Sequence, residues 1–309
     1  MQTQRVCIIG GSGFIGRSLA QRLGMHGFQV TIPTRKLARQ QPSMIVQPWV
    51  DLRESRLDDP EAIQQLIAGH DAVINMVGIL HGSRQDFERA HTELSARIVA
   101  ACRQAGIQRL LQVSALGSSA QSPSDYQQSK AAAEQFVMRS SLDWTVLRPS
   151  VVFGRGDRFL TLFAQLCRQL LLIPLAGANC QFQPIWVEDV AQAIEAALCN
   201  PASIGQTLEL AGPTRYTLRQ LVEYVGQLSG HPRRVIALPQ PLALLQATLM
   251  ECLPGAPLMS RDNLRALQSD NISHDRFPSA LLGFEPTQLE AVAPGYLGKT
   301  LYLHGRRSR

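Results

Sequence analysis

The first fifty residues of this chain contain no aspartate and no glutamate, and the first acidic residue is Asp51. Over all 309 residues, 24 acidic side chains face 30 basic ones, which gives a formal net charge of +6. A basic balance of this kind suits an anionic ligand or an anionic surface. Nucleic acid is not expected as a partner, because the basic residues are scattered and no aromatic-interleaved basic stripe or zinc-finger spacing occurs.

The sequence also lacks paired cysteines. It has no Cys-x-x-Cys motif and no histidine at metal-ligand spacing from a cysteine, so we expect no metal site. An N-terminal segment with a charged and then apolar secretion signal is missing as well. These absences favour reduced thiols in a cytoplasmic protein. The six cysteines are Cys7, Cys102, Cys167, Cys180, Cys199 and Cys252.

No apolar run is long enough to cross a bilayer as a helix. Two stretches come closest, "LLLIPLAGA" (170–178) and "VIALPQPLALLQATLM" (235–250), and both contain proline. Packing in a core or an interface is the simpler interpretation of both stretches, and contact with a membrane or a partner is the alternative.

The N-terminal segment "RVCIIGGSGFIGRSLAQRLGMHGFQVTIPTR" has the pattern of a strand, a glycine turn, an amphipathic helix and a second strand. Further apolar strands alternate with helical patterns up to about residue 153, which predicts an α/β fold with a doubly wound, parallel, Rossmann-like sheet. After Gly154 longer helices and prolines dominate. We therefore expect a Rossmann domain over 1–153 and a smaller, mostly helical C-terminal lobe over 154–309. Within that lobe, residues 181–212 are expected to return to the first sheet through the strands "FQPIWV" and "QTLELAG".

The glycine turn "GGSGFIG" places Gly10, Gly13 and Gly16 where the first strand turns into a helix. Glycines at these positions allow a sharp turn, the approach of a pyrophosphate and close packing of the helix on the strand. The first helical residues, Phe14, Ile15 and Gly16, would offer their N–H groups to the phosphates. The position of this turn in a complete βαβ unit predicts a dinucleotide site.

The residues after the second strand indicate which dinucleotide is bound. An NAD site normally places a carboxylate about 20 residues beyond the glycines, at the end of the second strand. Here the chain reads Thr34-Arg35-Lys36, and no acidic residue precedes Asp51. A guanidinium at Arg35, with Lys36 beside it, would pair with a 2′-phosphate. The sequence thus favours NADP(H) over NAD(H), the alternative being that both basic side chains are simply exposed.

"SDYQQSK" (124–130) places Tyr126 four residues before Lys130, on one face of a helix. An ammonium near a phenol stabilises the phenolate and lowers the phenol pKa, so the tyrosine would exchange protons near neutral pH. Beside a nicotinamide, this pair is the proton-transferring half of a carbonyl reduction. A tyrosine four residues before a lysine is common by chance. The preceding glycine turn makes a functional interpretation of the pair the more favoured one.

The motifs "GGSGFIG", "NMVG" (75–78), "YQQSK" and "LRPSVVFG" occur in this order and resemble those of the extended and atypical short-chain dehydrogenases/reductases. Within that superfamily, four longer segments resemble the nucleotide-binding accessory subunit of respiratory complex I and its bacterial relatives. These segments span nearly the whole chain: "RPSVVFGRGDRFL", "FQPIWVEDVAQAI", "MSRDNLRALQSDN" and "LGFEPTQLEAVAPGYL".

The resemblance implies roles for further residues. Asp51 and Leu52 would lie against the adenine, Met76, Val77 and Gly78 beside the cofactor, and Pro149 and Val152 on the nicotinamide side. Tyr126 and Lys130 would bind the nicotinamide ribose. Ser114 is the nearest match to the hydroxyl that polarises the substrate carbonyl, although many active members carry it about two places later, where this chain has Leu116.

Three functions remain open from the sequence. The first is an NADP(H)-dependent reductase that uses Tyr126, Lys130 and Ser114 on an apolar, lipid-like or quinone-like carbonyl. The second is a structural or assembly subunit that keeps the nucleotide in its core and docks on a membrane-associated complex at the inner membrane. The third is a nucleotide-sugar epimerase that recycles its nucleotide.

Other polar residues receive no site role. Asp189 in "WVEDVA" is expected to start a helix, where a carboxylate is favoured. His81 and His91 follow the fourth strand, but isolated histidines are usually surface or core residues. Cys7 in the first strand is expected to be a small buried group.

Overall fold

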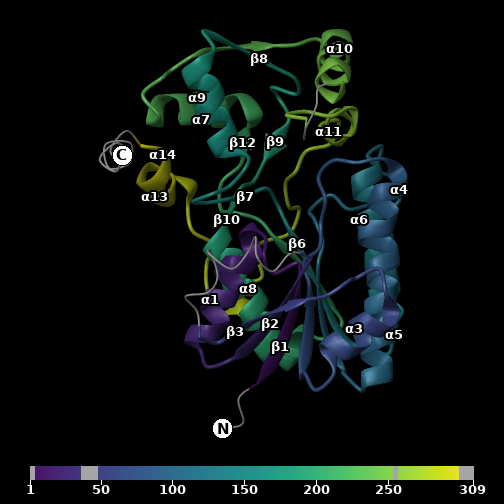
Figure 1. Ribbon diagram of the computed structural model, residues 1–309. Helices are drawn as coiled ribbons and strands as arrows, with labels where there is room; N and C mark the ends of the chain where they lie inside the picture. Colours follow the sequence, from purple (N-terminus) through teal and green to yellow (C-terminus); the bar gives the residue numbers. More distant parts are fainter. Residues whose placement is uncertain (1–3, 36–47, 253–256, 299–309) are drawn as a thin grey trace, which may run out of the picture. The chain divides into compact units, whose positions relative to one another are not determined.

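The structure is a computed structural model that describes residues 4–35, 48–252 and 257–298 (Figure 1). These residues form two compact units, and each unit is built from three separate segments of the chain. The first unit holds the described residues within Met1–Pro149, Val187–Leu210 and Pro278–Phe284. The second holds those within Ser150–Trp186, Ala211–Phe277 and Glu285–Arg309.

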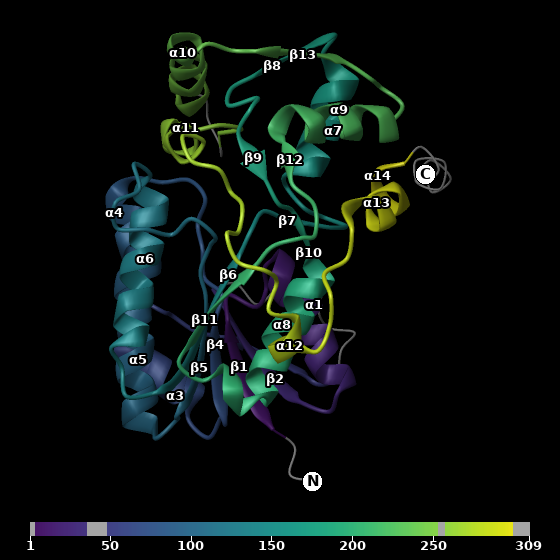
Figure 2. The ribbon, with the colours of Figure 1, turned by 180° about the vertical axis from the view of Figure 1, so that it is seen from behind.

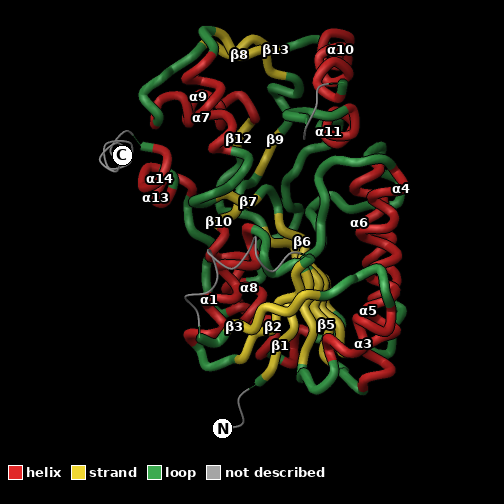
Figure 3. Tube along the Cα trace, in the orientation of Figure 1, coloured by secondary structure: helices red, strands yellow, loops and turns green. Residues whose placement is uncertain are grey.

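The first unit is built on a seven-stranded parallel sheet in the order β11-β6-β5-β4-β1-β2-β3 (Figure 3). Its central strands are apolar runs such as RVCII and AVIN, as a sheet covered on both faces requires. The predicted doubly wound parallel sheet is confirmed. The strands are β1 (Arg5–Ile9), β2 (Gln29–Thr34), β3 (Val50–Glu54), β4 (Ala72–Asn75), β5 (Arg109–Val113), β6 (Asp143–Pro149) and β11 (Gln206–Leu210).

Helices cover both faces of this sheet (Figures 1 and 3). On one face α1 (Phe14–Met25) packs against α8 (Val187–Cys199), where the Glu195 carboxylate binds both Arg22 and His26. The other face carries α3 (Pro60–Ile67), α5 (Leu94–Ala105) and α6 (Asp125–Met138). Since β1 lies between β2 and β4, the strand order reverses there, and ligands of such folds bind outside the carboxyl ends of the strands at this point.

The second unit combines helices with three two-stranded sheets around its own apolar core, which includes Phe153, Leu160, Phe163 and Leu221. The strand pairs are β7 (Val152–Phe153) with β10 (Ile185–Trp186), β9 (Gln181–Phe182) with β12 (Tyr216–Thr217), and β8 (Leu172–Leu175) with β13 (Arg234–Ala237). The helices are α7 (Leu160–Gln169), α9 (Leu218–Leu228), α10 (Gln240–Glu251), α11 (Arg261–Ala266), α13 (Leu289–Val292) and α14 (Pro294–Leu297) (Figure 2).

The chain is divided differently from the predicted boundaries. The first unit ends at Pro149 rather than at 153, and the segment that returns to it is Val187–Leu210. The strand in "QTLELAG" does join the sheet, as β11 beside β6. The expectation for "FQPIWV" is wrong, because β9 and β10 pair with β12 and β7 inside the second unit.

A second return to the first unit has no counterpart in the sequence analysis. The short helix α12 (Ser279–Leu282) contacts α8, and the Asn200 side-chain amide donates a hydrogen bond to the Leu281 carbonyl at 2.9 Å. A helix of four residues shows no helical periodicity in the sequence, so only its packing identifies it.

Across the residues that the structure describes, we find no helix with the length and apolar character needed to cross a membrane.

Candidate functional site

The glycine turn is shaped by close backbone approaches. Gly10 has φ +88°, and a Cβ atom at this position would lie 2.9 Å from the backbone nitrogen of Val77. A Cβ atom on Gly16 would overlap the backbone of Gly11. Only glycine therefore lets the turn lie against the end of β4 and lets α1 pack on the turn.

The N-terminus of α1 is suited to an anion. Its N-cap residue, Gly13, has no side chain that could accept from the N–H groups of the first turn, and that turn contains no acidic residue. Phe14, Ile15 and Gly16 begin the helix, as predicted. Their N–H groups and the positive end of the helix dipole fit the pyrophosphate of a dinucleotide.

An acidic residue that is distant in the sequence lies beside the carboxyl end of β2. Thr34 ends the strand and the exposed Arg35 follows it, while Lys36 lies outside the described residues. The register of β2 and β3 places Glu54 opposite Thr34, and the Ser55 N–H donates to the Thr34 carbonyl at 3.1 Å. The absence of an acidic residue before Asp51 therefore does not keep a carboxylate away from the end of the second strand, and the choice between NADP(H) and NAD(H) stays a prediction.

The proposed adenine contacts lie farther back on β3. Asp51 pairs in register with Thr31, and its exposed carboxylate accepts a hydrogen bond from Nε of Arg53 at 2.7 Å. Leu52 follows it, opposite Ile32. The contact of these two residues with an adenine stays a prediction.

Lys130 connects the ends of two central strands. Its side chain is 3% exposed, and its ammonium donates to the carbonyls of Val77 at 2.9 Å and Val113 at 3.2 Å. Gly78 lies so close that a Cβ atom there would be 3.4 Å from Nζ. Met76 donates its N–H to the Ile9 carbonyl at 2.8 Å. The lysine thus hydrogen-bonds both the segment after β4 and the end of β5. Met76, in that same segment, is bound to the end of β1.

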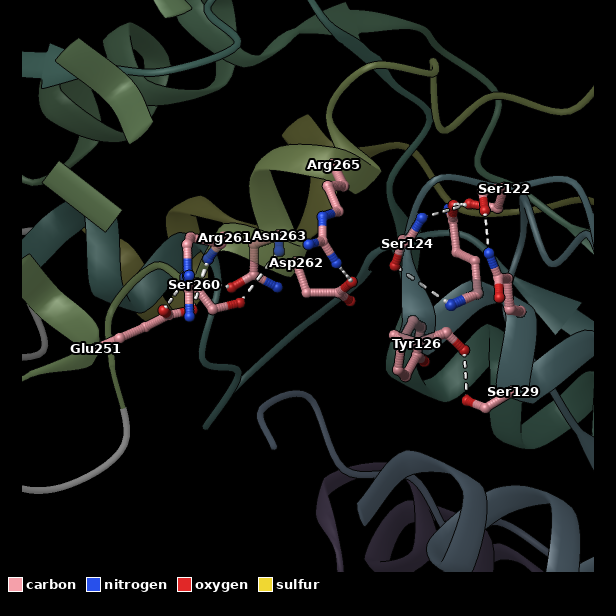
Figure 4. Close-up of polar contacts among 12 residues, drawn as sticks. Ser122, Ser124, Tyr126, Ser129, Glu251, Ser260, Arg261, Asp262, Asn263 and Arg265 are labelled. Atoms are coloured by element: carbon pink, nitrogen blue, oxygen red, sulfur yellow. Dashed lines mark hydrogen bonds and ion pairs between the residues drawn. The ribbon is translucent and has the colours of Figure 1, made fainter. Parts of the chain in front are cut away.

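Tyr126 lies in the first turn of α6, which begins at a well-capped N-terminus. The Ser124 hydroxyl accepts from the Gln127 N–H at 3.3 Å, and the Ser122 hydroxyl accepts from the Ser124 N–H at 3.1 Å (Figure 4). The tyrosine ring is half-buried and makes an edge contact with Phe87, at 5.9 Å between ring centroids. The serines in "SPSDYQQSK" thus fix the helix start that presents Tyr126.

His91 is a positioning residue that the sequence analysis left unassigned. Its Nε2 accepts the Ile79 N–H at 3.1 Å, and its Nδ1 lies 2.8 Å from the Ser129 hydroxyl, which donates to the Tyr126 carbonyl at 2.8 Å (Figure 4). Its ring also touches the Tyr126 ring edge-on, at 5.5 Å between centroids. Because Nε2 accepts, Nδ1 carries the proton. His91 lies in a π-helical turn (Glu88–Glu93), a feature often found at functional sites.

Burial dominates the protonation of these groups. It raises the pKa of Tyr126 to about 12 and lowers the pKa of Lys130 to about 8. Burial, and after it the Lys130 charge, lowers the pKa of His91 to about 3, so the imidazole is neutral at physiological pH. The expectation that Lys130 lowers the pKa of Tyr126 is wrong: the pKa is raised, burial of the phenol is the cause, and the ammonium is directed at two backbone carbonyls.

Ser114 follows β5 but its hydroxyl is already engaged. It lies 3.2 Å from the Ser118 hydroxyl, and Ser118 in turn donates to the Ala115 carbonyl at 2.7 Å. Leu116, at the position where the family resemblance would place the carbonyl-polarising hydroxyl, is buried and donates its N–H to the Pro149 carbonyl at 2.8 Å. Val152 begins β7 in the second unit. The roles of Ser114, Pro149 and Val152 stay predictions.

The remaining polar candidates have the structural roles expected of them. Asp189 is buried in the first turn of α8, and Cys7 is a fully buried thiol whose pKa burial raises to about 12. Among the residues that the structure describes, no group of histidine, cysteine and carboxylate side chains could hold a metal ion.

The comparisons with known proteins agree with this geometry. A family described as NAD(P)H-binding matches residues 10–157. The chain is 32% identical to the mitochondrial NADH dehydrogenase (ubiquinone) 1 alpha subcomplex subunit 9 of Arabidopsis thaliana, over 87% of this chain and 70% of that one. It is 29% identical to a ceramide reductase of Caulobacter vibrioides, over 80% of this chain and 77% of that one.

Solved structures share the fold at low identity. The structure matches the UDP-glucose 4-epimerase of Thermotoga maritima with a TM-score of 0.76 and 15% identity, over 98% of this chain and 99% of that one. From the nucleotide-binding turn, the sheet and these similarities, we conclude that the chain belongs to the NAD(P)-binding, Rossmann-fold family of short-chain dehydrogenase/reductase-like proteins that includes subunit 9 of the mitochondrial NADH dehydrogenase (ubiquinone) 1 alpha subcomplex.

Proposed function

We propose that this protein is an NADP(H)-dependent reductase of an apolar carbonyl compound. The observation that carries this proposal is the position of Lys130. Its buried ammonium joins the ends of β4 and β5, and it lies one helical turn from Tyr126. Burial of an ammonium is costly unless it is hydrogen-bonded, and here it is bound to two carbonyls beyond the carboxyl ends of central strands, the edge of the sheet where ligands of this fold bind.

The phenol of Tyr126 is the proton donor of the proposed reaction. With a pKa of about 12 it keeps its proton at neutral pH, which suits donation to a carbonyl oxygen that gains negative charge. Lys130 would hold the ribose, and Ser114 would donate a hydrogen bond to the carbonyl oxygen. The bound nucleotide supplies the hydride.

The substrate class is proposed from chemistry and one relative. In the second unit the sequence offers no charged constellation for a sugar or phosphate substrate, which suits a lipid-like or quinone-like carbonyl. The ceramide reductase of Caulobacter vibrioides is similar over most of its length, and ceramide is a lipid. The proposed substrate is therefore a ketone or quinone with a substantial apolar part.

NADP(H) is proposed as the preferred nucleotide, with NAD(H) less favoured. Arg35 directly follows β2 and is exposed, so it can reach a 2′-phosphate. Glu54, opposite Thr34, is the group that would instead accept from ribose hydroxyls and favour NAD(H). The preference depends on which of these two side chains faces the adenosine ribose.

A non-catalytic subunit that holds its nucleotide is the second candidate function. The buried Leu116 at the position of a catalytic hydroxyl, and the Ser114 hydroxyl directed at Ser118, both favour it. The relative in Arabidopsis thaliana is named as a subunit of NADH dehydrogenase. In this case the nucleotide would stabilise the fold by mass action, and the chain would belong to an assembly of the respiratory complex I type.

A nucleotide-sugar epimerase is the third candidate. It would use the same Tyr126 and Lys130 with a tightly held nucleotide that is oxidised and reduced within one catalytic cycle. The shared fold of the Thermotoga maritima epimerase is its support, and at 15% identity that likeness extends to the fold alone.

The proposed place of action is the cytoplasmic side of a membrane, with peripheral attachment. Cys7, Cys102, Cys167 and Cys180 are buried free thiols, which suits a reducing compartment. An apolar substrate or a membrane-associated partner complex would both be met at that surface.

The rate of nucleotide release and the variant Tyr126→Phe test the reductase. We expect NADPH to leave the protein within seconds in a fluorescence displacement experiment, and NADPH-dependent reduction of apolar ketones or quinones. Tyr126→Phe should keep the NADPH affinity within about threefold while turnover falls by about 100-fold or more, since general acid catalysis contributes this much. Retention of NADPH for hours would favour the subunit or the epimerase, and unchanged turnover in Tyr126→Phe would exclude the phenol as proton donor.

A further inference from the structure

The small sheet of β8 and β13 in the second unit has an apolar inner face and an outer face that is apolar except for Arg234. Its inner side chains, Ile173, Leu175 and Val235, belong to the core. The parallel register pairs Leu172 with Arg234 and Pro174 with Ile236, and all four are exposed. Leu171, just before β8, is 80% exposed. A two-stranded sheet with one face on a core normally presents polar residues to water, so the outer face departs from the usual alternation.

The helix α10, which follows β13, also departs from the usual pattern of burial. Its small residues Ala243 and Ala247, one turn apart, face inward and are buried. Its large residues face water: Leu242, Leu244, Leu245 and Leu249 are 51–61% exposed. A helix on a globular protein usually buries its leucines and exposes polar residues. Figures 2 and 3 show β8, β13 and α10 at the same end of the second unit.

We call these side chains the leucine surface: Leu171, Leu172, Pro174, Ile236, Leu242, Leu244, Leu245 and Leu249. Among β8, β13 and α10, the elements that carry it, the one acidic residue is Glu251 at the end of α10, which is paired with Arg261. Residues 158–186 and 224–250 include no aspartate or glutamate, whereas each segment has two arginines, Arg158 and Arg168 in the first and Arg233 and Arg234 in the second. The exposed Arg234 lies beside Leu172 on the outer face of the sheet. The surface thus combines apolar contact area with positive charge.

We propose that the leucine surface docks on a bilayer that contains anionic lipids. Leucines of the kind that line it are readily buried at the boundary of headgroups and acyl chains, and arginines near them attract anionic headgroups. Its side chains are all aliphatic, whereas protein–protein interfaces are enriched in tyrosine, tryptophan and phenylalanine. The proposal specifies the site of the peripheral attachment proposed above, and it is independent of catalysis.

Vesicle flotation with the full-length protein tests this docking. The probes are vesicles of phosphatidylcholine alone and of phosphatidylcholine with phosphatidylglycerol. We expect binding to the anionic vesicles to be about tenfold stronger or more, and to weaken with salt. The triple variant Leu244→Ser, Leu245→Ser, Leu249→Ser should lose about tenfold or more of this binding. Arg234→Glu should weaken binding to the anionic vesicles alone.

Matched controls separate docking from folding and from catalysis. Met25 and Phe136 are exposed apolar residues of the first unit, at 69% and 48%, so Met25→Ser with Phe136→Ser should leave vesicle binding unchanged. NADPH titration should give the same affinity in all variants. Absence of vesicle binding in the wild type, or equal binding in the triple variant, would overturn the proposal. A wild-type dimer that the triple variant dissociates, without lipid binding, would assign the surface to a second copy.

Discussion

His91 illustrates how one residue can join the parts of a nucleotide site. Its ring accepts from the Ile79 N–H, just after the segment that Lys130 holds, and reaches Tyr126 through the Ser129 hydroxyl. A neutral imidazole can make both bonds, whereas protonation would convert the Nε2 acceptor into a donor facing another donor. The low pKa of about 3 is the consequence of this burial and geometry.

The stability of the protein should therefore depend on pH through His91. The histidine of the unfolded chain titrates near its usual pKa of about 6.5. Below that pH the unfolded state therefore binds a proton that the folded state does not bind. Stability is full above about pH 6.5, and this residue alone should lower the unfolding free energy by about 1.5 kcal/mol between pH 6.5 and 5. Urea unfolding of wild type and His91→Gln across this range measures the difference, since the buried His70 is common to both.

An equal slope in the two proteins would show that His91 is not the titrating group. The glutamine retains an acceptor for the Ile79 N–H, so its NADPH affinity should stay closer to wild type than that of His91→Leu, which leaves this N–H without an acceptor.

The opposed charges of Arg35 and Glu54 predict the nucleotide preference. Arg35→Asp should weaken NADPH binding by about 10- to 100-fold, the range of one charge-assisted contact, and leave NADH binding nearly unchanged. Glu54→Gln should weaken NADH and spare NADPH. Fluorescence titration with both nucleotides measures the two variants. An equal loss of both nucleotides in Arg35→Asp would refute the NADP(H) assignment.

At the level of elements, α1 depends on its contact with the glycine turn. A Cβ atom on Gly16 would meet the backbone of Gly11, which cannot move without displacing the end of β1. Helix and strand are therefore held close enough for a pyrophosphate to span the turn and the helix N-terminus.

Gly16→Ala should accordingly destabilise the protein by about 1–3 kcal/mol, the usual cost of overpacking, and weaken NADPH binding. Gly295 in α14 is the matched control, because it is exposed and a Cβ atom there would have nothing within 4 Å. Gly295→Ala should be neutral or stabilise by up to about 1 kcal/mol through helix propensity. Thermal unfolding and NADPH titration measure both, and similar behaviour of the two variants would contradict the packing argument.

At the level of the whole molecule, the Rossmann sheet of the first unit needs a segment from later in the chain, Val187–Leu210. The β11 strand pairs with β6, and α8 packs on α1 through the Glu195 carboxylate. Without residues 187–210 the apolar side of α1 and the edge of β6 would be exposed to water.

A chain that ends at Pro149 should therefore fail to fold cooperatively. We expect it to aggregate or to show no thermal transition by circular dichroism, whereas the full-length chain should unfold cooperatively and gain stability with NADPH by about 2.7 kcal/mol at 100 times the dissociation constant. A soluble, cooperatively folded fragment that binds NADPH would show that α8 and β11 are dispensable.

The sequence by itself determined those features that depend on local pattern. Alternating apolar runs predicted the parallel sheet, and the spacing of Gly10, Gly13 and Gly16 predicted the turn, because few backbones satisfy such patterns. Only the tertiary structure decided what depends on register and packing. It placed Glu54 beside Thr34, directed Lys130 at two carbonyls, brought His91 to Tyr126 and turned the leucines of α10 outward. These contacts join residues that are distant in the chain, and burial, which sets their pKa values, exists only once the chain has folded.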